Sequence, residues 1–131
     1  MYSRYNLFAF LLGIILFFLN LYRNQSLPDL QMGGWLPFDK FAHCVQFIVL
    51  SFITTVGFAK QSESKMIQYN PMQYSMVICG IFAIILELWQ FCFLYQYFQI
   101  LDSLANFIGI LIGILIFLLI YKKINLFSKI N

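Results

Sequence analysis

Four long apolar stretches limit what this chain can fold into. They cover about residues 6–22, 40–59, 74–94 and 101–121. A helix needs about 20 residues, at about 1.5 Å each, to cross roughly 30 Å of hydrocarbon, and each stretch is close to that length. None alternates polar and apolar residues as the strands of a membrane barrel do. We therefore expect an all-α membrane protein, a bundle of four transmembrane helices in a single domain over residues 1–131.

The composition excludes an ordinary soluble domain and argues against nucleic acid as a partner. Hydrophobic residues make up 62% of the chain and charged residues 10%, whereas a soluble domain carries about 25% charged residues. The net charge is +3, but the basic residues form no run interleaved with polar residues. The three cysteines lack CxxC spacing. We expect free thiols that pack as small apolar side chains, with a disulfide as the less favoured alternative.

The first apolar stretch resembles a secretory signal because Arg4 precedes it. No small-x-small cleavage site follows it; the next residues are Arg23, Asn24 and Gln25. We therefore expect a retained helix, with a signal peptide as the minor alternative. Loops are predicted at residues 23–38 and 60–73, and an aromatic and amide-rich turn at residues 95–99.

The orientation follows from the basic residues. With four crossings, both termini and the 60–73 loop share one side, which holds Arg4, Lys60, Lys65, Lys122, Lys123 and Lys129. The other side holds only Arg23 and Lys40. Because basic residues stay cytoplasmic, we expect a multi-pass membrane chain with both termini in the cytoplasm.

In this topology, polar residues from three helices arrive at the outer membrane face: Asp39, Lys40, His43, Glu87, Gln90, Asp102 and Asn106. At about 100° per residue, Asp102 and Asn106 lie on one stripe of the last helix with Gly109 and Gly113, within about 60° of one another. The two glycines form a small-xxx-small motif, which lets a neighbouring helix approach closely. A buried carboxylate such as Glu87 costs roughly 2.5–3.5 kcal/mol in hydrocarbon, so we expect it to be partnered, with Lys40 and His43 as the expected partners.

The ordered set Asp39-Lys40-x-x-His43, Glu87-x-x-Gln90 and Asp102-x-x-x-Asn106-x-x-Gly109-x-x-x-Gly113 resembles the VanZ-like membrane protein family, over roughly Phe38 to Leu119. The resemblance implies a bacterial inner-membrane protein of the cell envelope, linked to glycopeptide (teicoplanin) resistance. The chain departs from the family at Gln96, where the family has an arginine. If that arginine binds an anionic group, Lys40 or Arg23 would have to supply the contact here.

Two functions compete for this polar set. In the first, the protein binds or modifies a membrane lipid or a lipid-linked cell-envelope ligand. Glu87, His43 and Asp102 would then carry acid–base chemistry, and Asp39, Lys40, Gln90 and Asn106 would bind the ligand. In the second, the protein is a non-enzymatic structural or partner protein whose polar residues only stabilise the bundle. Asp39 has a simpler role as a helix N-cap.

Other functions are less favoured. A metal held by His43, Glu87 and Asp102 is disfavoured because no His or Cys pair has ligand spacing, so we expect no metal and no cofactor. A proton path would need acidic groups throughout the membrane depth, and the inner halves of the helices lack them. An oligomer is compatible with this organisation.

Overall fold

The computed structural model describes residues 3–26, 38–61, 63–93 and 100–128. Every regular element in these residues is a helix: α1 (Ser3–Ser26), α2 (Phe38–Lys60), α3 (Lys65–Tyr69), α4 (Pro71–Phe93) and α5 (Ile100–Ser128). The expected all-helical class is therefore confirmed. The predicted turn at residues 95–99, with Gln96, and most of the predicted 23–38 loop lie outside the described residues.

The helix boundaries differ from the predicted ones in four places. Helix α1 runs from Ser3 to Ser26 rather than over residues 6–22, so residues 23–26 of the predicted loop are helical. Residues 65–69, predicted as loop, form the short helix α3. Helix α4 begins at Pro71 rather than near residue 74, because proline suits the first helical position, where no backbone N–H is needed. Helix α5 continues to Ser128, past the expected end at residue 121.

The connection between α2 and α3 is held by one buried amide side chain. Gln61 accepts hydrogen bonds from the backbone N–H groups of Glu63 (3.1 Å) and Ser64 (3.0 Å), and its Nε2 donates to the Ser64 carbonyl at 2.6 Å. These bonds satisfy backbone groups that a turn leaves without helical partners. The chain can therefore turn sharply between the two helices.

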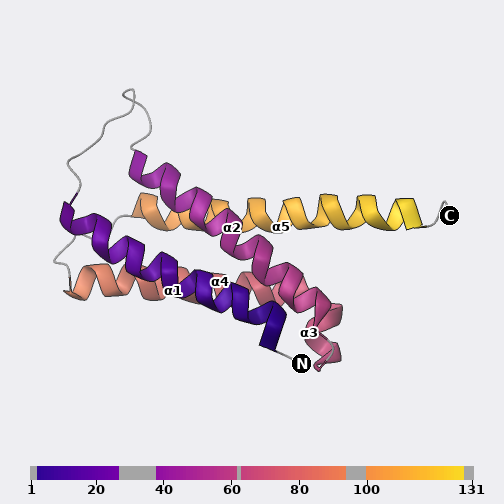
Figure 1. The fold of residues 1–131 in the computed structure, drawn as a ribbon. Helices are drawn as coiled ribbons and strands as arrows, with labels where there is room; N and C mark the ends of the chain where they lie inside the picture. Colours follow the sequence, from indigo (N-terminus) through magenta and orange to yellow (C-terminus); the bar gives the residue numbers. More distant parts are fainter. Residues whose placement is uncertain (1–2, 27–37, 62, 94–99, 129–131) are drawn as a thin grey trace.

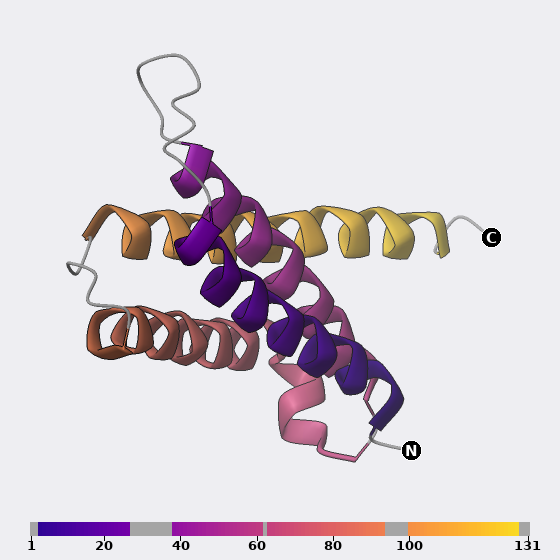
Figure 2. The same cartoon turned by 60° about the vertical axis from the view of Figure 1, so that its left-hand side comes forward.

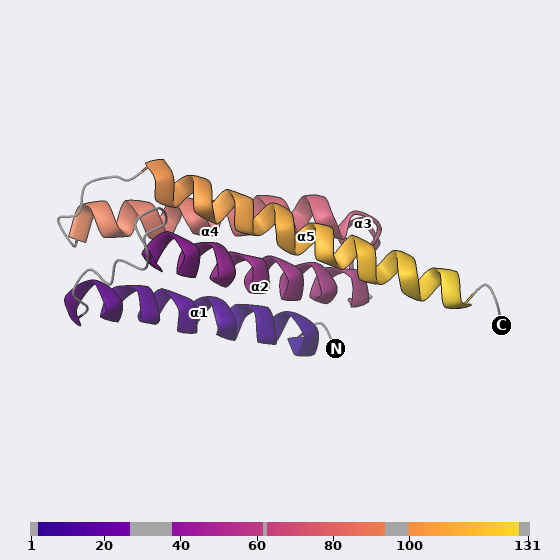
Figure 3. The same cartoon turned by 90° about the horizontal axis from the view of Figure 1, so that it is seen from above.

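Helix α2 is the central element of the bundle. It packs most extensively against α5, and it also packs against α1 on one side and α4 on another (Figure 1, Figure 3). The start of α2, the end of α4 and the start of α5 lie at one end of the bundle, whereas α3 and the start of α1 lie at the other (Figure 1, Figure 2). The antiparallel order therefore brings together the helix ends that carry the polar residues.

The surface of the bundle is apolar. Large side chains such as Phe8, Ile81 and Leu111 are more than half exposed. The core is built around Phe47 and Ile110. So much exposed apolar area would be a liability in water. Within the described residues, three helical segments are long and apolar enough to cross a membrane: Lys40–Lys60, Pro71–Cys92 and Ile100–Tyr121. Helix α1 contains a shorter apolar run, Asn6–Leu19.

Two glycines set the distance between α2 and α5. A Cβ atom added at Gly109 would overlap the Cys44 carbonyl oxygen and lie 3.0 Å from the Phe47 Cβ. A Cβ atom at Gly113 would overlap the Ile48 carbonyl oxygen and the Ser51 hydroxyl. The backbones of the two helices therefore pack closer together than any side chain at these positions would permit.

Candidate functional site

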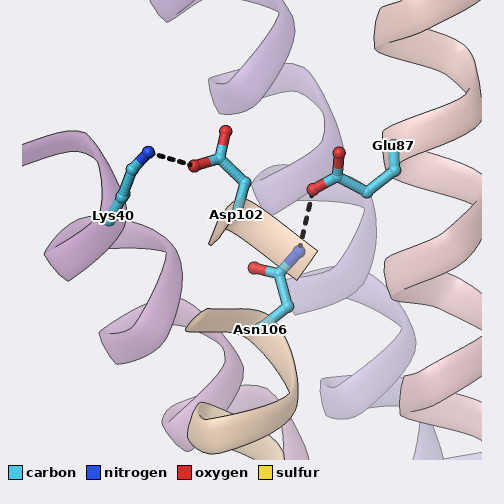
Figure 4. Close-up of polar contacts among 4 residues, drawn as sticks. All are labelled: Lys40, Glu87, Asp102 and Asn106. Carbon is cyan, nitrogen blue, oxygen red and sulfur yellow. Dashed lines mark hydrogen bonds and ion pairs between the residues drawn. The ribbon is translucent and has the colours of Figure 1, made fainter. Parts of the chain in front are cut away.

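Four polar side chains from α2, α4 and α5 meet at one end of the bundle: Lys40, Glu87, Asp102 and Asn106 (Figure 4). We call this group the polar cluster. Its residues come from three separate helices and lie in the end portions that the antiparallel order brings together. All four were predicted from the sequence to lie at one level of the bundle.

One part of the polar cluster is an ion pair between α2 and α5. The Lys40 Nζ lies 3.4 Å from Asp102 Oδ1, and the two side chains are 17% and 9% exposed. The geometry is that of an ion pair without a hydrogen bond, because the same Oδ1 accepts none within the described part of the chain. Asp102 lies in the first turn of α5, where the helix dipole favours a negative charge.

The other part is a hydrogen bond between α4 and α5. The Asn106 Nδ2 donates to Glu87 Oε1 at 3.3 Å, and the two residues are 1% and 6% exposed. Asn106 follows Asp102 by one helical turn, so both point from the same face of α5. The Glu87 and Asp102 carboxylates are close enough to repel each other electrostatically. The amide of Asn106 therefore holds one carboxylate of a closely spaced pair.

The expected pairing of Glu87 with Lys40 is wrong. Lys40 pairs with Asp102, and Glu87 accepts from Asn106 instead. The close packing of α2 on α5 at Gly109 brings the start of α2 against the start of α5, where Asp102 lies.

The remaining predicted site residues flank the polar cluster. His43 is buried one turn after Lys40 in α2, and Gln90 is buried one turn after Glu87 in α4. Asp39 lies in the first turn of α2, and its side chain is outside the described residues. Their roles as ligand-binding or acid–base groups stay predictions.

A second set of buried polar residues lies deeper in the bundle and was missed by the sequence analysis: Ser51, Thr54, Thr55 and Ser75. The two threonine hydroxyls donate to carbonyls one turn earlier in α2, each at 2.7 Å. The Ser75 hydroxyl donates from α4 to the Ser51 carbonyl at 3.2 Å. Ser and Thr within a predicted span are the signal that could have identified this set. Because their hydroxyls all have acceptors, we assign these residues to helix packing.

The polar cluster combines groups that can bind a polar ligand and carry acid–base chemistry. In the part of the chain that the structure describes, no three His, Cys, Asp or Glu side chains are arranged to hold a metal ion. The cluster instead combines two carboxylates, an ammonium group and an amide. Such groups can bind a polar headgroup or move a proton to or from it.

The family model described as VanZ/LLP1 matches residues 2–121, which include α1 as well as the helices that carry the polar cluster. Neither a curated protein nor a solved structure matches the chain.

Proposed function

The chain belongs to the VanZ/LLP1 family, and from that premise we propose that it is a polytopic protein of the bacterial inner membrane that binds an amphiphilic ligand at the polar cluster. The proposed topology has four crossings, with α1 as the first, and both termini in the cytoplasm. The unequal distribution of Lys and Arg between the two ends supports this orientation. The polar cluster then lies near the outer membrane face, where a lipid headgroup or a lipid-linked envelope precursor is within reach.

The topology can be tested with single cysteines. Ser64→Cys and Gln25→Cys, in a background with the three native cysteines replaced, place thiols at opposite ends of the bundle. In intact cells, a membrane-impermeant maleimide should label Gln25→Cys and leave Ser64→Cys unlabelled until the cells are permeabilised. Labelling of Ser64→Cys in intact cells would reverse the proposed orientation.

The observation that carries the ligand-binding proposal is the convergence of two carboxylates from different helices in an apolar bundle. Placing the Glu87 and Asp102 carboxylates close together costs electrostatic energy when both are ionised, and the Lys40 ammonium lies beside Asp102. Apolar residues in these positions would give a bundle without that cost. The presence of both acids is therefore better explained by a ligand than by helix packing.

The proposed roles follow from the contacts. Glu87 is the candidate base, and Asn106 orients it through the hydrogen bond to Oε1. Asp102 and Lys40 form the more accessible edge of the polar cluster, where a ligand would first meet it. His43, Gln90 and Asp39 are the proposed neighbours of the bound ligand. Through its family, we assign the protein to the cell-envelope response to glycopeptides such as teicoplanin.

The decisive experiment is Glu87→Gln in a strain whose teicoplanin tolerance depends on this protein. The amide oxygen of glutamine can still accept from Asn106, so the variant should fold and reach the membrane in normal amounts. We expect it to lose the tolerance, because the charge and the basic site are gone. Ser75→Ala, which removes a buried hydroxyl outside the polar cluster, is the matched control and should keep it.

The competing function is purely structural, and one observation favours it: both carboxylates have partners within the bundle. Under that reading, Glu87→Gln should be as stable as the wild type or more so, with full tolerance. A stable, abundant and fully active Glu87→Gln protein would therefore replace the ligand-binding proposal with the structural one.

A further inference from the structure

The polar cluster has more hydrogen-bond acceptors than donors. Asn106 donates its Nδ2 to Glu87, and its own Oδ1 is buried and accepts no hydrogen bond from any described residue. The Oδ1 of Asp102 likewise accepts none, although Lys40 lies 3.4 Å away. Figure 4 shows the Asn106 oxygen pointing away from Glu87. Buried acceptors without a donor are rare, because each costs about 1–3 kcal/mol, so the missing partner is a donor.

The charges of the polar cluster show the same imbalance. When both carboxylates are ionised they face one ammonium, so one negative charge has no counterpart among these four side chains. An uncompensated charge in an apolar bundle is costly, and a ligand carrying one positive charge would remove that cost. A phosphate group would do the opposite, because it adds negative charge and further acceptors.

Building on the proposed function, we propose that the polar cluster binds the protonated primary amine of its ligand. A primary ammonium group supplies three N–H donors and one positive charge, which matches both deficits. Asn106 Oδ1 and Asp102 Oδ1 are the acceptors, and Glu87 supplies the second negative charge. The arriving ammonium shares Asp102 with Lys40, whose own ammonium already lies beside that carboxylate. The amine can come from an aminophospholipid headgroup or from a water-soluble amine.

The test uses the purified full-length protein in a neutral detergent. Phosphatidylethanolamine, phosphatidylcholine and phosphatidylglycerol with identical acyl chains are offered in equal amounts, and native mass spectrometry counts the lipids retained. Phosphatidylcholine is the sharp comparison, because its quaternary ammonium has the same charge but no N–H donor. We expect retention of phosphatidylethanolamine to exceed that of the other two by about tenfold, the effect of one charge-assisted hydrogen bond.

Variants locate this selectivity. Glu87→Gln and Asp102→Asn should each lower phosphatidylethanolamine retention about tenfold, and Ser75→Ala should leave it unchanged. Lys40→Met should raise retention of phosphatidylethanolamine, because it removes a competing cation; if the cluster bound a phosphate, the same variant would instead lower retention of phosphatidylglycerol. The glutamine in Glu87→Gln is uncharged, as a protonated Glu87 would be. Unchanged retention of phosphatidylethanolamine by this variant would therefore mean that a proton on Glu87, and not the amine of a ligand, neutralises the polar cluster.

Free ethanolamine identifies the source of the amine. Displacement of phosphatidylethanolamine by ethanolamine supports the proposal and shows that the amine alone suffices; retention in its presence supports a lipid-borne amine. Equal wild-type retention of phosphatidylethanolamine and phosphatidylcholine would overturn the proposal. A cluster-dependent preference for phosphatidylglycerol would also overturn it, while leaving the proposed ligand site intact. Retention of all three lipids that no cluster variant changes would refute both this proposal and the proposed function.

Discussion

Gly109→Ala should separate the two helices that position the polar cluster. The added Cβ atom would overlap the Cys44 carbonyl oxygen and lie 3.0 Å from the Phe47 Cβ. The first neighbour is backbone and the second is the stem of a fully buried side chain, so neither can rotate out of the way. Helices α2 and α5 must therefore move apart along their closest contact.

The expected cost is about 2 kcal/mol. Overpacking a close-packed interior costs about 1–3 kcal/mol, and rigid neighbours on the α2 side favour the upper part of that range. The higher helix propensity of alanine offsets up to about 1 kcal/mol of this loss in stability. The clash therefore outweighs the gain, and the separation of α2 from α5 also lengthens the distance between Lys40 and Asp102.

The assay is unfolding of the purified protein by SDS in mixed micelles, followed by far-UV circular dichroism. Gly80→Ala is the matched control, because its Cβ would lie an ordinary 3.8 Å from Phe107 Cε1. The control should be neutral or slightly stabilising, and Gly109→Ala should be destabilised. Equal stability of the two variants would refute the close contact between α2 and α5.

Three further predictions concern contacts between helices, each measured by the same unfolding assay. Lys40→Met should lower the free energy of unfolding by about 3 kcal/mol, which is the low end for breaking a buried ion pair because Lys40 is partly exposed. Adding Asp102→Leu to this variant should recover part of the lost stability. Ser75→Ala should cost about 0.6 kcal/mol, the average for an interhelical hydrogen bond in membranes. Phe17→Ala should cost at least about 0.5–1.5 kcal/mol, because it removes the edge-to-face contact of α1 with Trp89 at 5.5 Å between ring centroids. The first prediction is contradicted by a double variant that loses as much stability as its two single variants together. The second is contradicted by a loss above about 2 kcal/mol in Ser75→Ala, and the third by an unchanged free energy of unfolding in Phe17→Ala.

Much of the fold could be predicted because membrane helices leave a local record in the sequence. The apolar stretches, their lengths and the prolines between them placed α2, α4 and most of α5 within a few residues. The stripe of Asp102, Asn106, Gly109 and Gly113 is buried, as the helical period predicts. The short helix α3 was missed because five residues, separated from α4 only by Asn70, are too few to show an apolar periodicity.

The sequence by itself determined which residues lie at the polar end of the bundle and which face of each helix they occupy, since hydropathy and helical period are properties of consecutive residues. Only the tertiary structure decided which polar groups meet. Lys40 pairs with Asp102 and Glu87 with Asn106 because the glycines of α5 bring it onto α2, and a distance between two helices depends on the packing of all the side chains between them. The acceptors left without donors are likewise a product of that packing, and no local pattern of residues encodes them.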